Sequence, residues 1–163
     1  MDDELIAGIG KYIVGKSPDI LLAIGLGSCI GCNIYDPKLK IGGLAHIMLP
    51  NSKQYLNVKS KLSNNKFADI AISLLVKEMI SNGSKIEDMV AKIVGGAHIF
   101  EGIIKNDSLD IGKRNEEAVK EELKKLGIKI IAKSTGGNIG RTTRFELETG
   151  IIHINTKEGK FDI

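Results

Sequence analysis

Aromatic residues are scarce in this sequence. Trp is absent, and Phe, Tyr and Trp together make up 4% of the chain. Proteins that bind single-stranded nucleic acid stack the bases on aromatic side chains, and proteins that bind duplexes carry clustered positive charge. Here 23 Lys and Arg residues stand against 20 Asp and Glu, and no block of like charge stands out. We therefore expect no binding of nucleic acid.

Cysteine and long apolar runs are also scarce. Cys29 and Cys32 are the two cysteines, too few for a disulfide framework in a chain of this size. No apolar run approaches the roughly 20 residues that span a bilayer. The start Met1-Asp2-Asp3-Glu4 is acidic, unlike a secretory signal. These absences predict a cytoplasmic protein without membrane insertion, in a reducing compartment that suits a free thiol.

Length and composition predict one domain over residues 1–163. A chain of 163 residues with 42% hydrophobic residues is long enough for one buried core and short for two. Strands are predicted at 8–14, 19–24, 30–35, 41–44, 89–94, 129–133, 142–148 and 151–155, and helices at 66–82 and 113–126. Asn64 or Asn65 is available to cap the first helix, and Gly83 to end it. The mixed order and the hairpins predict an α+β fold of largely antiparallel sheets covered by helices.

A predicted hairpin contains the best nucleophile and the best base of the sequence. Asp36-Pro37-Lys38 is typical of a turn, because Pro presets φ at the second turn position. A turn centred between Pro37 and Lys38 places Cys29 opposite His46. Directly opposed residues have Cβ atoms roughly 4.5–5.5 Å apart. The pattern therefore predicts that the two side chains meet on one face, provided that no bulge shifts the register.

A thiol beside an imidazole suggests acyl transfer or amide hydrolysis. The imidazole takes the thiol proton, and the resulting thiolate can attack a carbonyl carbon. Gly27 permits a sharp turn before Cys29, and the backbone amides around Gly27 and Ser28 are candidate donors to an oxyanion. The alternative is structural, because free Cys is among the most buried residue types and a His in an apolar run is often a packed residue.

The two cysteines also match a C-x-x-C pair, Cys29-Ile30-Gly31-Cys32. Residues three apart on a strand face opposite sides, so we expect neither a shared metal nor a disulfide and interpret Cys32 as a packing residue. His98 is either a site residue or, as we favour, a structural one. The polar segment 51–65 is either an ordinary connection or a flap that admits a substrate.

A glycine-rich segment, residues 134–141, raises the question of phosphate binding. Its spacing fits neither a Walker loop nor a dinucleotide fingerprint, and no helix signal follows. We therefore expect no nucleotide cofactor. Arg141 is interpreted as a loop anchor or as a contact with a substrate surface.

Six motifs follow one another along nearly the whole chain. They are Leu26-Gly27-Ser28-Cys29, His46-Ile47-Met48-Leu49-Pro50, Lys66-Phe67-Ala68-Asp69, Ala91-Lys92-Ile93-Val94-Gly95-Gly96-Ala97, Ile111-Gly112-Lys113-Arg114-Asn115 and Gly136-Gly137-Asn138-Ile139-Gly140-Arg141. In this order they resemble the CheD family of chemoreceptor glutamine deamidases. The ordered set is far more specific than the first motif alone.

The resemblance implies a cytoplasmic hydrolase that converts selected glutamine side chains of chemotaxis receptors to glutamate with release of ammonia. It implies Cys29 as the nucleophile, His46 as the general base and acid, and no cofactor. It further implies a layered sandwich of sheets flanked by helices, and a CheC-type phosphatase as a partner.

One position departs from the family pattern, which has a Thr six residues before the cysteine that helps to orient the His. Ala23 stands there, and Ala cannot hydrogen-bond an imidazole, so a backbone carbonyl or another hydroxyl would have to do so. Two alternatives therefore stay open. The chain could act mainly as a chemotaxis adaptation module that binds a CheC-type phosphatase, or the Cys-His pair could hydrolyse receptor methyl esters.

Overall fold

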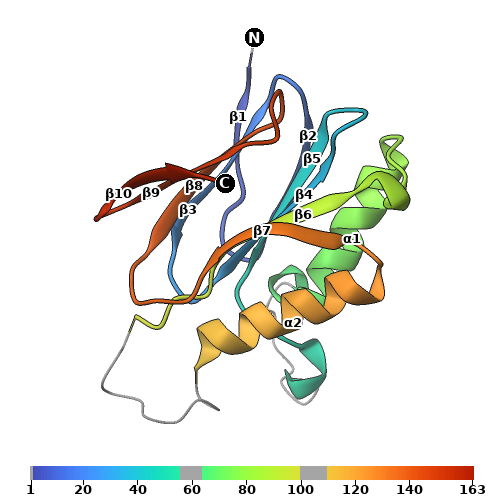
Figure 1. Cartoon of the computed structure of the whole chain (residues 1–163). Helices are drawn as coiled ribbons and strands as arrows, with labels where there is room; N and C mark the ends of the chain where they lie inside the picture. Colours follow the sequence, from blue (N-terminus) through green and yellow to red (C-terminus); the bar gives the residue numbers. More distant parts are fainter. Residues whose placement is uncertain (1, 56–63, 100–109) are drawn as a thin grey trace.

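Two β-sheets stacked face to face and a layer of helices make up the fold (Figure 1). The computed structural model describes residues 2–55, 64–99 and 110–163. The outer sheet contains, in spatial order, β1 (Glu4–Ile6), β3 (Ile20–Leu26), β8 (Arg141–Glu146), β9 (Ile152–Thr156) and β10 (Gly159–Asp162). The central sheet contains β2 (Tyr12–Lys16), β5 (Ile41–Ile47), β4 (Ile30–Asp36), β6 (Val90–Gly95) and β7 (Lys129–Thr135). Helices α1 (Ala68–Ser81) and α2 (Ile111–Lys125) cover the free face of the central sheet.

Most strand pairs are antiparallel. The exceptions among the described strands are β1 with β3 and β6 with β7, which run parallel. The predicted closing hairpin is present, with Phe145 of β8 opposite Ile152 of β9. The structure thus confirms the predicted α+β class, with layered and mainly antiparallel sheets flanked by helices.

The inner strands β4 and β5 of the central sheet are buried on both faces. One core lies between this sheet and the two helices, and we call the second, between the two sheets, the inter-sheet core. A Cβ on Gly42 would lie 2.3 Å from Leu147 of the outer sheet layer, and a Cβ on Gly43 would lie 2.5 Å from Leu75 of α1. These two glycines of β5 therefore allow both neighbouring layers to approach closely.

The helix ends differ in part from the prediction. Helix α1 begins after Phe67, which makes no side-chain capping bond, so the predicted cap by Asn64 or Asn65 is wrong; those two residues lie in a short 3-10 turn, Asn64–Lys66. The predicted end is correct, since Gly83 follows the helix with φ +107°, a conformation that favours glycine. At the start of α2, the carboxylate of Asp110 accepts a hydrogen bond from the backbone N–H of Lys113.

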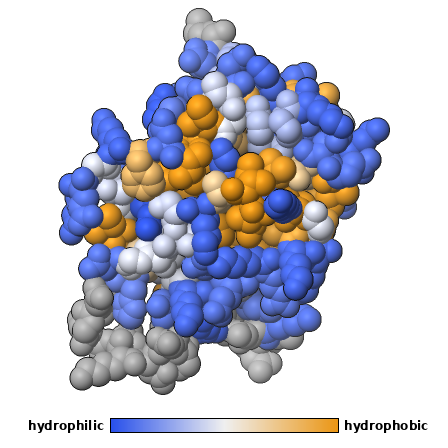
Figure 2. Space-filling model, in the orientation of Figure 1, coloured by the Kyte–Doolittle hydropathy of each residue, from blue (hydrophilic) through white to orange (hydrophobic). Residues whose placement is uncertain are grey.

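Two edge strands, β1 and β10, were not predicted, and the strand predicted at 8–14 begins at Tyr12. The predicted loop at 51–65 includes a second 3-10 turn at Ser52–Tyr55 and otherwise falls largely outside the described residues; a third such turn is at Ile86–Asp88. On the face in Figure 2, apolar surface gathers around β7, where Ile131 is half exposed, whereas α2 below it is mainly hydrophilic. No helix in the described ranges is long and apolar enough to cross a membrane.

Candidate active site

Cys29 lies in a bend between β3 and β4, held against the end of β6. The backbone N–H of Gly96 donates to the carbonyl of Cys29 at 2.8 Å, and the N–H of Ala97 donates to the carbonyl of Gly27 at 2.8 Å. A Cβ on Gly95 would lie 2.2 Å from the carbonyl oxygen of Cys29, and φ of Gly95 is +116°. The double glycine Gly95-Gly96 is therefore a place of close backbone approach.

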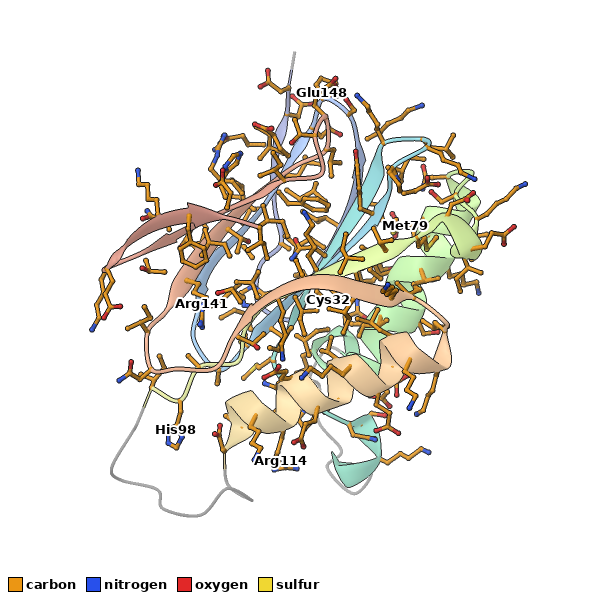
Figure 3. The ribbon with its side chains drawn as sticks, in the orientation of Figure 1. Cys32, Met79, His98, Arg114, Arg141 and Glu148 are labelled. Carbon is orange, nitrogen blue, oxygen red and sulfur yellow. The ribbon has the colours of Figure 1, made fainter. Side chains whose placement is uncertain are left out.

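Arg141 anchors the glycine-rich segment beside this bend. Its guanidinium donates to the carbonyl of Gly136 at 2.9 Å, to the hydroxyl of Ser134 at 3.1 Å and, at 3.5 Å, to the carbonyl of Gly95. The side chain is buried, between the outer sheet and β7 in Figure 3. The interpretation of Arg141 as a loop anchor is thus confirmed, and it supports the strand end that holds Cys29.

His46 lies inside the molecule on β5, with 2% of its surface exposed. Its Nδ1 is 3.0 Å from the carbonyl oxygen of Ala7, between β1 and β2. Because a carbonyl only accepts, Nδ1 carries the ring proton and Nε2 keeps its lone pair. Nε2 makes no hydrogen bond within the described part of the chain. The ring is thus held as the neutral tautomer that can act as a base through Nε2.

The register differs from the predicted one. His46 pairs with Gly31, and the ladder between β4 and β5 ends at Ile30 and Ile47, so Cys29 is not directly opposite His46. The reason lies in the turn, where the carboxylate of Asp36 accepts from the backbone N–H groups of Lys38 and Leu39, and Lys40 adopts φ +53°. These contacts make the connection longer than the predicted tight turn.

The β4–β5 register is shifted by two residues from the predicted one. Because side chains alternate with a period of two, this shift leaves each side chain on its predicted face of the sheet. Cys29 packs against the inter-sheet core, to which Leu44 and Ala7 also belong, and His46 is two residues from Leu44 and bonded to Ala7. Cys29, one residue beyond the last ladder pair, and His46 therefore both border the inter-sheet core.

Both groups are neutral at rest. Burial raises the pKa of the Cys29 thiol, an effect that its own backbone N–H partly offsets. Burial likewise lowers the pKa of His46, partly offset by the hydrogen bond to Ala7. At neutral pH the site therefore contains a thiol and a neutral imidazole.

The bend also contains backbone amides that are candidate donors to a substrate oxygen. Its residues Gly27, Ser28 and Cys29 are half-buried, and their carbonyls accept hydrogen bonds from the protein interior. Within the described ranges, the N–H groups of Ser28 and Cys29 donate to no backbone carbonyl. These amides are available to an oxygen that develops negative charge.

The remaining sequence candidates have structural contacts. Cys32 is fully buried in the helix-side core, on the face opposite Cys29, and burial raises its pKa to about 12. The described residues contain no cluster of metal-binding side chains. His98 donates its backbone N–H to Gly137, and its Nδ1 is 3.3 Å from Asp110 at the start of α2 (Figure 3). His98 thus links the glycine-rich segment to α2.

Comparison with known proteins identifies the family. Residues 48–156 match the family model described as CheD chemotactic sensory transduction. A protein of Caldanaerobacter subterraneus subsp. tengcongensis named "Probable chemoreceptor glutamine deamidase CheD" is 47% identical over 157 residues, which cover 96% of this chain and 95% of the relative. A protein of Clostridium botulinum strain Hall with the same name is 47% identical over 153 residues, 94% of this chain and 93% of the relative. The chain belongs to the CheD family.

Proposed function

We propose that the chain is a protein-glutamine deamidase that acts on chemotaxis receptors, with Cys29 as the nucleophile. The names of its relatives support the reaction and the substrate. The observation that carries the proposal for this site is the orientation of His46, whose Nδ1 proton is committed to Ala7 while Nε2 is left as a base on the face that Cys29 shares.

In the proposed mechanism, Nε2 of His46 takes the proton of the Cys29 thiol as the sulfur attacks the amide carbon of a glutamine side chain. The amides of Ser28 and Cys29 donate to the resulting oxyanion, an interaction worth about 3 kcal/mol per donor in other enzymes. Protonated His46 then gives its proton to the departing ammonia, which leaves a thioester on Cys29. Water, deprotonated by His46, then attacks the thioester and releases glutamate. His46 returns the proton to the sulfur of Cys29.

The Ala7 carbonyl orients the His46 ring, which in the family pattern is the role of a Thr hydroxyl at position 23. Ala23 is fully buried and offers no polar group, whereas Ala7 accepts from Nδ1 at 3.0 Å. The same hydrogen bond stabilises the imidazolium that forms when Nε2 takes the thiol proton. The departure at Ala23 is therefore compatible with catalysis.

Mass spectrometry of a receptor's cytoplasmic fragment tests this function. The fragment is incubated with wild-type protein, with Cys29→Ala and with Cys32→Ala, a matched control because Cys32 faces the helices on the other side of the sheet. Wild type and Cys32→Ala should convert specific glutamines to glutamate, and folded Cys29→Ala should not. Conversion by Cys29→Ala at the wild-type rate would overturn the mechanism.

We further propose a cytoplasmic location and a CheC-type phosphatase as partner, which the likeness of the ordered motifs to the CheD family supports. Capture of this phosphatase by wild-type protein and equally by Cys29→Ala would support a binding role that needs no chemistry. If folded wild-type protein captured the phosphatase but converted no receptor glutamine or methyl ester, the binding module would replace the enzyme as the best interpretation.

A further inference from the structure

The two segments that carry Cys29 and His46 separate where their ladder ends. Beyond Ile30, the segment from Gly27 to Cys29 turns toward the end of β6, where its carbonyls accept hydrogen bonds from the N–H groups of the two residues that follow that strand. Beyond Ile47, the N–H groups of Met48 and Leu49 both donate to the carbonyl of Lys66, in front of α1. The strands thus open into a fork, defined here by residues 27–29 and 48–49, and no ladder bond crosses it.

One side chain from a different element closes the fork. The amide nitrogen Nδ2 of Asn115, on α2, donates to the carbonyl of Ser28 at 3.0 Å and to the carbonyl of Met48 at 3.0 Å. Asn115 is fully buried. We infer that Asn115 is a positioning residue that sets the spacing between Cys29 and His46; this inference rests on the proposed function.

The amide is present as a donor. Both Nδ2 protons go to backbone carbonyls, which fixes the orientation of the amide group, and Oδ1 is buried without a hydrogen bond within the described ranges. A carboxylate of the same shape has no proton for either carbonyl, and an apolar side chain leaves both carbonyls unpaired. The position therefore requires two donors on one short side chain.

The helix that carries Asn115 is seated rigidly enough for this task. A Cβ on Gly112 would lie 2.6 Å from the carbonyl oxygens of both Gly96 and Ala97, so the first turn of α2 is in direct backbone contact with the segment that holds Cys29. The Asp110 cap and its contact with His98 hold the same turn as well. The helix turn just before Asn115 is therefore held in place relative to the fork.

We call the two hydrogen bonds from Asn115 to the carbonyls of Ser28 and Met48 the clamp. Loss of the clamp should lower the rate of the chemical step. The fork residues include Cys29 on one side and begin two residues after His46 on the other, so a change in the fork moves the thiol relative to the imidazole. A misplacement of about 1 Å between reacting groups can lower a rate by roughly 10²-fold. Asn115 is fully buried and is therefore out of reach of a substrate that docks on the exposed side of the bend, as the proposed function requires. We expect Asn115→Ala to lower kcat by about 10²-fold with KM changed less than about threefold.

Asn33 provides a matched control. It is also a buried asparagine, its Nδ2 donates to two carbonyls, those of Gly31 and Lys92, and its Oδ1 is likewise unpaired within the described chain. The carbonyls that it joins lie in β4 and β6, which are already paired by a ladder. Asn33→Ala should therefore destabilise the protein as Asn115→Ala does and leave kcat within about threefold of wild type.

A second readout needs no receptor. Iodoacetamide alkylation should report Cys29 alone, because Cys32 is fully buried. If Asn115→Ala opens the fork, water reaches the thiol and the pH midpoint of alkylation moves down toward the ordinary thiol value. Asn33→Ala should keep the wild-type midpoint. Asn115→Ser, which keeps one donor, should fall between wild type and Asn115→Ala and serves if the alanine variant does not fold.

The outcomes separate the two proposals. A shifted midpoint in the Asn115 variants alone, with no deamidation by wild type, would retain the clamp and reject the deamidase. Deamidation by wild type, with kcat and midpoint unchanged in both Asn115 variants or changed equally in Asn33→Ala, would retain the deamidase and reject the clamp.

Discussion

Gly112→Ala sets two effects of opposite sign against each other. Within a helix, replacing glycine by alanine stabilises by about 1 kcal/mol through backbone entropy. At this position, however, the new Cβ would lie 2.6 Å from two carbonyl oxygens, those of Gly96 and Ala97, and 2.8 Å from the carbonyl carbon of Gly96. These contacts are roughly 1 Å closer than ordinary non-bonded ones. Backbone on both sides has to move, and such overpacking costs about 1–3 kcal/mol.

The overpacking should win, because backbone held by a sheet yields less than the end of a side chain does. We expect a net loss of up to about 2 kcal/mol, which for a protein of this size lowers Tm by up to about 8 °C. Displacement of α2 also carries Asn115 away from the fork, so kcat should fall in the variant. Thermal unfolding followed by circular dichroism and the receptor mass assay measure the two effects.

Gly127→Ala is the matched control for this helix. Gly127 follows the C-terminal end of α2 with φ +72°, and a Cβ there meets no atom within 4 Å. The variant should lose about 1–2 kcal/mol through backbone strain alone and keep the wild-type kcat. A rise in Tm for Gly112→Ala would refute the packing argument, and a lower Tm with unchanged kcat would refute the link from the helix seat to the site.

Two further predictions concern stability. Burial lowers the pKa of His46, so the unfolded chain binds its proton more readily, and stability should fall as the pH drops below about 6.5, by up to about 1.4 kcal/mol per pH unit. His46→Gln should flatten this slope in urea unfolding between pH 7 and pH 5, and an unchanged slope would assign the acid sensitivity to other groups. Arg141→Met removes the donors to Gly95 and Gly136 and should cost about 2–4 kcal/mol in the same assay, whereas a cost below about 1 kcal/mol would show that those carbonyls find other partners.

The elements that could be predicted are those with a local pattern. Helix α1 follows from its apolar spacing and Gly83, and β4 and β5 follow from apolar runs on either side of a turn. Strands β1 and β10 have no such pattern, because they lie at the two edges of the outer sheet and are mostly exposed. Their pairing partners, rather than their own residues, make them strands.

The candidate site shows the same division. Cys29 and His46 are predicted from chemistry and spacing as candidates, but the register depends on Asp36 accepting two backbone N–H groups, a choice among turns that the residues alone did not decide. The Ala7 carbonyl could not be found from sequence, because every residue has a carbonyl and only the fold brings this one to His46. A signal for Asn115 existed, since a polar residue on the buried face of a helix needs a buried partner.

The order of burial explains why a neutral pair suits this site. Cys29 is half-buried at the surface bend, whereas His46 is buried and bonded to the Ala7 carbonyl, so in the proposed mechanism a proton leaving the thiol moves inward. Since burial disfavours both charged forms, the thiolate and the imidazolium stabilise each other only when they form together. In the proposed mechanism, a glutamine amide that covers the bend supplies the carbon to be attacked, and the amides of Ser28 and Cys29, which pair with no backbone carbonyl in the described chain, donate to the oxygen that gains charge. Under the proposed mechanism, the thiol therefore stays protonated, and weakly reactive toward other electrophiles, until a substrate amide occupies the bend.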